Sequence, residues 1–262
     1  MVNKQNKAIG IFDSGIGGSS IWKEINSLLP YENTIYLADS KHAPYGQKSK
    51  DQIIALSIKN TEYLLEQNCK LIVVACNTAT TNAIQYLRET YNIPFIGIEP
   101  AIKPASISSK TRSIGILATK GTLNSQLFSK TANTLTNIEI IEQIGTGLVE
   151  LIEEGKINSD EMDFLLKKHL SKFNSKNIDS LVLGCTHYPY LIPQIRKIID
   201  SNISIIDSGF AVAKQTKNIL SIHDLINANK TKPNNLFYSN TNPEIFNKIL
   251  NNKELNPKYL DF

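Results

Sequence analysis

Two stretches of the chain repeat one pattern, in which an apolar strand ends in a cysteine and polar residues then open a helix. Leu71–Thr80 reads LIVVACNTAT, and Ser180–Pro189 reads SLVLGCTHYP. An apolar run of this length is typical of a strand buried on both faces of a parallel sheet. We therefore expect Cys76 and Cys185 at equivalent strand ends, the position at which open α/β sheets bind their ligands.

Neighbouring segments repeat in the same order. IGIFD at 9–13 matches IGILA at 114–118, and FIGIE at 95–99 matches SIIDS at 204–208. Repetition of this kind indicates duplicated structure, and strands that alternate with helices predict parallel sheets. We therefore predict an α/β fold of two pseudo-symmetric lobes. Each lobe is a mostly parallel sheet flanked by helices, and the active site lies in the cleft between them.

The repeat also predicts where the lobes divide. Residues 1–99 and 209–262 are assigned to the first lobe, and residues 100–208 to the second. Pro100–Lys110 is Ser-rich and lacks apolar periodicity, so we expect it to be a connection. The Asn- and Lys-rich remainder should hold a helix, a strand at Leu236–Tyr238 and a helix opened by Pro243. We expect it to pack back on the first lobe.

Composition excludes several classes of protein. The 262 residues are 41% hydrophobic and 20% charged, with a formal charge of +4 and no Lys/Arg run longer than two, so nucleic acid is not an expected partner. The polar amino terminus does not resemble a signal peptide and no segment is long enough to span a membrane, which favours a cytoplasmic protein. The three cysteines, Cys69, Cys76 and Cys185, lack the C-x-x-C spacing of a zinc or redox site. Cys69 is given no role.

Two thiols that face each other across a cleft predict a particular chemistry. One can remove a proton from one face of a carbon while the other delivers a proton to the opposite face, which inverts the stereochemistry. This needs no metal and no cofactor. A thiol suits the task once its pKa, ordinarily about 8.5, is brought towards neutrality, which a helix amino terminus and a nearby charge can do.

Two ionisable side chains lie at the same strand ends as the thiols. His187, two residues beyond Cys185, is a candidate proton partner, and Asp13 could serve Cys76. The turn from Gly15 to Gly18 after Asp13 lacks the spacing of the dinucleotide fingerprint. It should leave backbone N–H groups at a helix start, which suit a carboxylate.

Five motifs between residue 8 and about residue 210 carry a resemblance to a known family. They are Asp13-Ser14-Gly15-x-Gly17-Gly18, Asp39-Ser40 with Pro44-Tyr45-Gly46, Cys76-Asn77-Thr78-Ala79-Thr80, Ile98-Glu99-Pro100, and Gly184-Cys185-Thr186-His187-Tyr188-Pro189. In this order they resemble the glutamate racemases of the cofactor-independent aspartate/glutamate racemase superfamily.

The resemblance implies roles for individual residues. Cys76 would handle the α-proton of D-glutamate and Cys185 that of L-glutamate, with Asp13 supporting Cys76 and His187 supporting Cys185. No cofactor and no metal are implied. The substrate contacts implied are Asp13, Ser14, Tyr45, Gly46, Asn77, Thr78, Thr186 and His187.

An additional acidic residue is also implied, and the chain offers three candidates for it. Glu153 aligns with the family position, but many members carry Cys-Pro shortly before this helix where the chain has Gly145-Thr146-Gly147. Glu150 and Glu154 therefore stay open as alternatives to Glu153 as the catalytic acid.

The resemblance further implies a homodimer that supplies D-glutamate for bacterial peptidoglycan synthesis. Other functions remain open at this point. The enzyme could racemise aspartate or another small acid. The two lobes could instead form a module that binds an anion, with structural cysteines, or a redox sensor that forms a disulfide between Cys76 and Cys185.

Overall fold

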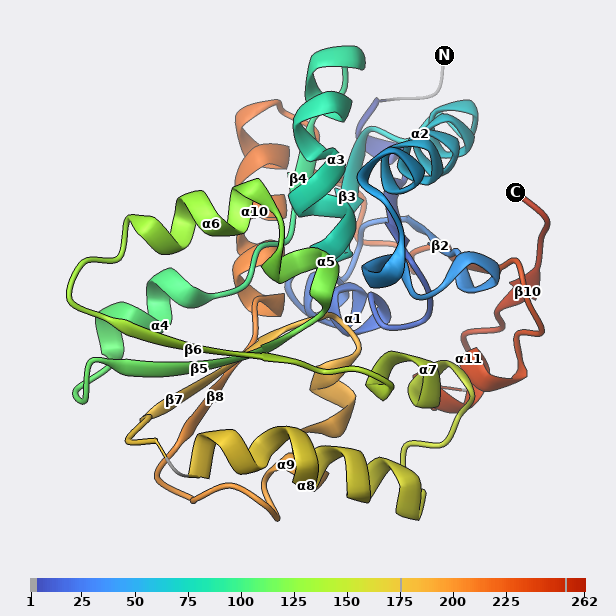
Figure 1. Ribbon diagram of the computed structural model, residues 1–262. Coiled ribbons are helices and arrows are strands. Elements are labelled where there is room, and N and C mark those ends of the chain that lie inside the picture. The colour runs from blue at the N-terminus through green and yellow to red at the C-terminus, as the bar shows by residue number, and fades with distance from the viewer. Residues whose placement is uncertain (1–3, 175, 253) are drawn as a thin grey trace.

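The computed structural model describes residues 4–174, 176–252 and 254–262, and they form two parallel sheets (Figure 1). This confirms the predicted α/β class. The six-stranded sheet has the order β10-β9-β2-β1-β3-β4, and the four-stranded sheet has the order β6-β5-β7-β8. The strands are β1 Ile9–Asp13, β2 Thr34–Ala38, β3 Leu71–Val74, β4 Phe95–Gly97, β5 Ser113–Ala118, β6 Glu139–Ile144, β7 Ser180–Gly184, β8 Ser204–Ile206, β9 Asn235–Ser239 and β10 Lys258–Tyr259.

The two sheets share one topology. In the first, β1 pairs with β2 on one side and β3 on the other, so that Ile9 lies beside Thr34 and Leu71. In the second, β5 pairs in the same way with β6 and β7. The order β2-β1-β3-β4 thus repeats as β6-β5-β7-β8, and β3 and β7, which precede the two cysteines, occupy equivalent places.

Helices surround both sheets. The longest, α2, begins with a capping box in which Ser49 Oγ accepts from the backbone N–H of Gln52 and the Gln52 side chain accepts from Ser49 N–H. The α-helices are α1 Ser19–Leu28, α2 Lys50–Glu66, α3 Asn77–Thr90, α4 Ile102–Ser108, α5 Lys120–Leu123, α6 Gln126–Asn133, α7 Leu148–Glu153, α8 Asp160–Asn174, α9 Ile192–Ile195, α10 Gly209–Ile222 and α11 Glu244–Leu250. Short 3-10 helices lie at Lys4–Asn6, Ser40–His42, Tyr45–Gln47 and Tyr188–Leu191.

One apolar core joins the two sheets. Because successive side chains of a strand point to opposite faces, Ile11 and Phe12 belong to different clusters. The cluster that holds Ile11 continues through Leu117 and Leu183 of the second sheet. The carboxyl ends of β3 and β7 are therefore anchored in one continuous core, which fixes the two cysteine turns relative to each other.

One expectation about the connections is wrong, and one short strand was not predicted. Pro100–Lys110 is not an irregular connection, because it contains helix α4. Ile102 and Ala105 are buried at a spacing of three, but two turns of helix are too short to show a clear period. Strand β10 was not predicted either, because two residues are too few to show the alternation of a strand.

The C-terminal segment returns to the first sheet. Strand β9 pairs with β2 over its whole length and β10 pairs with β9, so β10 forms the edge of the sheet, and Figure 1 shows β10 and α11 on the side of the molecule that carries β2. Pro243 precedes α11, as the sequence predicts. On this basis we propose the lobe division at residues 1–99 with 209–262, and 100–208, of which residues 1–3, 175 and 253 lie outside the described part.

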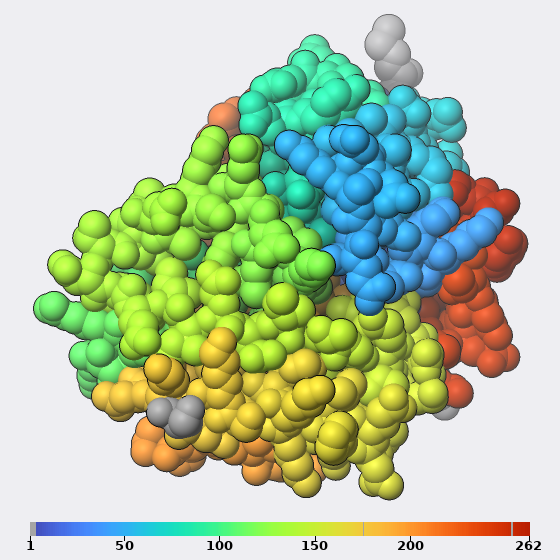
Figure 2. Space-filling view, viewed as in Figure 1, coloured from blue at the N-terminus to red at the C-terminus, as the bar shows by residue number. Residues whose placement is uncertain are grey.

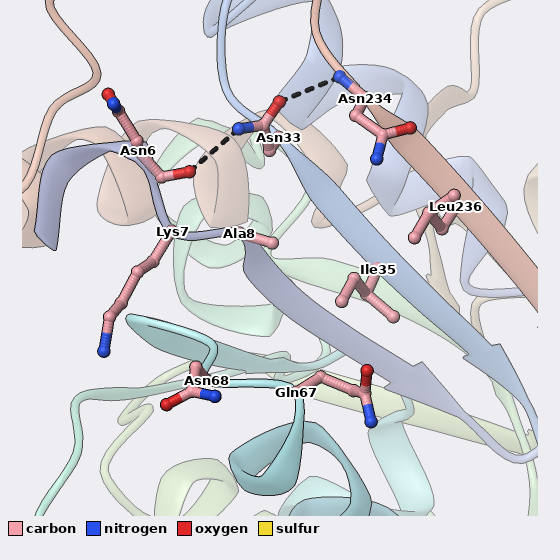
Figure 3. A pocket seen from close by; sticks show the side chains of 9 residues that line it. All are labelled: Asn6, Lys7, Ala8, Asn33, Ile35, Gln67, Asn68, Asn234 and Leu236. Atoms are coloured by element: carbon pink, nitrogen blue, oxygen red, sulfur yellow. Dashed lines mark hydrogen bonds between the residues drawn. The ribbon is translucent and has the colours of Figure 1, made fainter. Parts of the chain in front are cut away.

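A pocket of about 600 Å³ lies at the amino ends of β1, β2 and β9 (Figure 3). Apolar side chains such as Ile35 and Leu236 line it together with amides such as Asn33 and Gln67. It faces away from the carboxyl strand ends that carry the cysteines, so it is separate from the site described below. Within the described ranges, no helix combines the length and apolar character that a membrane crossing requires.

Candidate active site

Each cysteine lies where a central strand ends. Cys76 is the N-cap of α3, and its Sγ accepts from the N–H of Ala79 at 3.4 Å. Cys185 follows Gly184, the last residue of β7. Their exposed fractions are only 4% and 6%. The predicted equivalence of the two positions is therefore present in the fold, and both thiols are shielded from water.

On the first lobe, Asp13 and Ser14 accompany Cys76. The Cys76 thiol donates to Ser14 Oγ at 3.5 Å, and Ser14 Oγ donates to Asp13 Oδ1 at 3.4 Å. Asp13 Oδ2 accepts from the N–H of Gly18 at 2.7 Å. Thr186 of the Cys185 turn lies 3.5 Å from both carboxylate oxygens of Asp13, which joins the two lobes.

The electrostatics around Cys76 differ from the sequence-based expectation. Burial raises the pKa of the Cys76 thiol well above its ordinary value, and the charge of Asp13 raises it further. The N–H of Ala79 at the start of α3 acts in the opposite direction but is outweighed. The charge of Cys185 also raises the Cys76 pKa, so the two thiols sense each other. The Cys76 thiol is therefore kept in its protonated form.

On the second lobe, His187 links Cys185 to Glu153. His187 Nδ1 lies 3.7 Å from Cys185 Sγ, and Nε2 lies 2.6 Å from Glu153 Oε1. Burial lowers the pKa of His187, but hydrogen bonds and charges from Cys185 and Glu153 raise it more, so the result is well above the ordinary value. His187 is therefore an imidazolium held between a sulfur and a carboxylate.

Glu153 also fastens the second lobe to the first. Its Oε1 accepts from the N–H of Ile16 at 2.7 Å, and its Oε2 accepts from Ser40 Oγ at 2.7 Å. The Glu153 side chain is 13% exposed. Three polar atoms thus orient one carboxylate: Ile16 N and Ser40 Oγ across the lobe boundary, and His187 Nε2 within the second lobe.

The two rival glutamates lie elsewhere. Glu150 Oε1 accepts from Gln47 Nε2 at 2.6 Å in an exposed contact, and Glu154 pairs with Lys156 on the surface. Of the three candidates, the structure places only Glu153 beside His187. The sequence alone could not choose among the three glutamates. They lie one to four residues apart in and just after helix α7, and only the orientation of that helix towards the first lobe decides which of them reaches His187.

The glycine turn has a use that the sequence did not reveal. A Cβ on Gly15 would lie 2.0 Å from Glu153 Oε1, and a Cβ on Gly17 would lie 2.2 Å from His187 Nδ1. These glycines allow the close approach of Glu153 and His187. The backbone N–H groups of the turn do bind carboxylates, but these belong to the protein: Ile16 donates to Glu153 and Gly18 donates to Asp13.

The predicted substrate contacts on α3 fall into two kinds. Asn77 is 2% exposed, and both its amide nitrogen and its amide oxygen lack a partner. A buried amide without partners points to a ligand. Thr78 Oγ1, in contrast, lies 2.8 Å from Thr119 Oγ1 and 3.3 Å from Thr122 Oγ1 of the second lobe.

Thr119 and Thr122 were missed as site residues. Thr119 follows β5 as Ser14 follows β1, so the internal repeat itself could have indicated a hydroxyl at this strand end. A pocket of about 250 Å³ opens beside Thr119, lined also by Gly46, Gln47 and Glu150. It lies at the junction of the two lobes.

Tyr45 is buried with its hydroxyl already bound. The hydroxyl donates to Asp39 Oδ2 at 2.5 Å and accepts from Asn60 Nδ2 at 3.1 Å. The adjacent Gly46 packs against Thr119, where a Cβ would approach to 2.8 Å. Any contact of this segment with a ligand is therefore left to the main chain.

The buried carboxylate of Asp13 is expected to lower the stability of the protein while it supports the activity. Burial raises its pKa from 3.8 to about 6, so the folded protein binds this proton more tightly than the unfolded chain. The stability that Asp13 contributes is complete below pH 3.8 and is lost as the pH rises through about 6. We expect Asp13→Asn to raise the free energy of unfolding at pH 7.5 by about 2–3 kcal/mol and to lower the rate of proton transfer through Cys76 by about 10- to 100-fold.

The measurement is thermal unfolding of wild type and Asp13→Asn between pH 5 and 7.5. The stability difference should shrink as the pH falls, because Asp13 of the wild type then takes up its proton. A variant that is less stable than wild type at pH 7.5, with the same pH dependence, would contradict the assignment.

Two thiols at equivalent strand ends, each with its own proton partner, define the class of amino-acid racemases that use two bases. The comparisons with known proteins agree. Residues 18–216 match the model of the Asp/Glu/hydantoin racemase family. The chain is 42% identical to a glutamate racemase of Cupriavidus pinatubonensis over 240 residues, which cover 91% of this chain and 88% of the relative.

Solved structures show the same likeness over nearly the whole chain. A glutamate racemase from Bacillus anthracis superposes with a TM-score of 0.89 at 28% identity, and one from Francisella tularensis in complex with D-glutamate with a TM-score of 0.85 at 32% identity. Each comparison covers 98% of both chains. The chain belongs to the Asp/Glu/hydantoin racemase family and, within it, to the glutamate racemases.

Proposed function

We propose that the protein interconverts L-glutamate and D-glutamate by proton transfer at the α-carbon, with Cys76 and Cys185 as the two bases. The observation that carries this proposal is the pair of buried thiols at equivalent strand ends, one in contact with His187 and the other linked through Ser14 to Asp13. The glutamate racemases it resembles over most of its length support glutamate as the substrate. We further propose a cytoplasmic homodimer that supplies D-glutamate for peptidoglycan synthesis.

In the direction from L- to D-glutamate, Cys185 takes the α-proton from one face and Cys76 gives its proton to the other. The raised pKa of Cys76 suits it as the donor, since burial keeps the thiol protonated. The imidazolium of His187 faces the Cys185 sulfur and is held there by Glu153. The reverse reaction exchanges the roles, and Asp13 then faces the thiol that must lose its proton. Because both thiols are almost fully buried, the lobes must separate to admit the substrate.

Binding of glutamate is proposed to use groups from both lobes. Asn77 offers an unpaired donor and an unpaired acceptor, and Thr78 with Thr119 and Thr122 offers a cluster of hydroxyls. The segment at Tyr45 and Gly46 contributes main-chain groups at the junction of the lobes. Ser14, Thr186 and the charged pair Asp13 and His187 complete the set.

Asn77→Ala is expected to raise the KM for glutamate by about tenfold without loss of stability. The side-chain amide has no hydrogen-bond partner within the protein, so its removal relieves the cost of two unsatisfied buried groups while it deletes two contacts to the ligand. Steady-state kinetics and thermal unfolding of the empty protein test this together. A lower unfolding temperature with an unchanged KM would show that Asn77 is structural.

Circular dichroism of separate L- and D-glutamate solutions, with aspartate alongside, tests the function. The protein should bring either glutamate enantiomer to a racemic mixture without added cofactor and should exchange the α-proton in D₂O. A module that only binds would bind glutamate and exchange nothing. A redox sensor would leave both enantiomers unchanged and form a disulfide between Cys76 and Cys185 under mild oxidant. Preferential turnover of aspartate would reassign the substrate.

A further inference from the structure

Asn240 is a buried amide in the C-terminal segment, for which the sequence indicated no chemistry. It follows Ser239, the last residue of β9, and is 4% exposed. Because β9 pairs with β2, Asn240 reaches the carboxyl end of β2, from which the chain leads to Tyr45 and Gly46. Figure 2 shows the red C-terminal segment against the blue segment that follows β2.

The side chain and the backbone N–H of Asn240 bond one segment, residues 38–41. Nδ2 donates to Asp39 Oδ1 at 2.5 Å, and Oδ1 accepts from the N–H of Lys41 at 2.9 Å. The backbone N–H of Asn240 donates to the carbonyl of Ala38 at 3.4 Å. One side chain thus holds a carboxylate and the backbone N–H two residues after it.

The carboxylate that Asn240 holds is the centre of the segment. Asp39 is fully buried, and its second oxygen accepts from the hydroxyl of Tyr45. His42 Nδ1 lies 2.6 Å from Oδ1, and Lys59 Nζ lies 3.7 Å from it. The orientation of Asp39 therefore decides where Tyr45 lies, and with it the neighbouring Gly46 at the junction of the lobes.

We propose that Asn240 is a positioning residue for catalysis. It acts through Asp39 to hold residues 39–46 in the conformation that presents the main chain of Tyr45 and Gly46 to the substrate. This rests on the proposed glutamate racemisation. The C-terminal segment thereby completes the active site of the first lobe, and the second sheet has no counterpart to β9 among the described residues.

The test compares Asn240→Ala, Asn240→Asp and a matched control, Asn242→Ala. Asn242 lies two residues away and is exposed, and its Oδ1 accepts from the N–H of Glu244 at the start of α11. Aspartate at position 240 keeps the shape of asparagine and the acceptor for Lys41, but it cannot donate to Asp39. Ionised at this position, it places a second negative charge beside the buried Asp39, so it should disturb residues 39–46 at least as much as alanine does.

Asn240→Ala should raise the KM for glutamate about tenfold with kcat within about twofold of wild type, as loss of a hydrogen bond to a charged group implies. Asn240→Asp should be no better, and Asn242→Ala should match wild type. Amide hydrogen exchange without glutamate should speed up at residues 39–46 in Asn240→Ala and stay unchanged at residues 185–191. If alanine lowers the unfolding temperature to that of the assay, Asn240→Ser takes its place.

Three results would overturn the inference: unchanged exchange at residues 39–46, a wild-type KM in Asn240→Ala, or a wild-type KM in Asn240→Asp. The exchange measurement needs no turnover. A wild-type protein that fails to racemise glutamate would therefore refute the proposed function, while the exchange data would still decide whether Asn240 holds the segment.

Discussion

Replacement of either Cys76 or Cys185 by serine is expected to lower the racemisation of glutamate by about a thousandfold or more. Inversion needs one group that takes the proton and another that returns it on the opposite face, and general acid–base groups contribute about 10²- to 10⁴-fold each. A serine hydroxyl occupies the space of the thiol but is a far poorer acid. The remaining thiol reaches only one face of the α-carbon, so neither variant should retain full turnover in either direction.

Cys69 offers the matched control. It is as buried as Cys185, but it packs beside Gly10 and Leu64, at the amino end of β3 rather than the carboxyl end. Burial raises its pKa to about 12, which makes it an inert thiol. Cys69→Ala should therefore racemise glutamate at a rate within about twofold of wild type.

The measurement is the loss of optical activity of L- and D-glutamate, followed by circular dichroism for all three cysteine variants. Mass spectrometry after incubation in D₂O then asks whether a single thiol still exchanges the α-proton without inversion. Undiminished racemisation in either Cys76→Ser or Cys185→Ser would refute the two-base mechanism, whatever the exchange result.

Glu153→Gln is the second change with a large expected effect, a loss of about 100-fold in kcat/KM. The glutamine keeps the size of the side chain but removes the negative charge that faces the His187 imidazolium at 2.6 Å. Loss of one partner of a buried ion pair costs about 3–5 kcal/mol in general. We expect part of this cost here, because Glu153 retains some exposure and glutamine still accepts from Ser40 or Ile16.

Glu150→Gln and Glu154→Gln are the controls, since they remove the same charge from the same helix or its end. Both side chains bond only exposed partners, so kcat/KM should stay within about twofold of wild type. The two enantiomers have equal free energies in water, so any variant must change kcat/KM by the same factor in both directions. If Glu150→Gln or Glu154→Gln reduces activity as much as Glu153→Gln, the assignment of the acidic residue is wrong.

Much of the fold was predictable because its signals are local. Apolar runs such as Leu71–Val74 and Ser180–Gly184 are strands in the structure at those bounds, and polar residues directly after them start helical turns. Helix α4 and strand β10 were not predicted, since elements of seven and two residues show too little of a period.

The site was predictable where one residue follows one strand, and not where a side chain must cross between elements. Asp13, Cys76 and Cys185 each lie at the end of an apolar strand that the sequence shows, and His187 lies in the turn after Cys185. The choice among the glutamates of helix α7 and the residue after it depends on which side of that helix meets the first lobe.

The sequence by itself determined that two strand ends carry thiols at equivalent places, because the strand–cysteine–helix unit is repeated along the chain. Only the tertiary structure decided the charges around those thiols. Burial raises the pKa of Cys76 where the helix start alone would lower it, and contacts with Cys185 and Glu153 raise the pKa of the buried His187. These effects arise from desolvation and from contacts between distant segments, which no local pattern records.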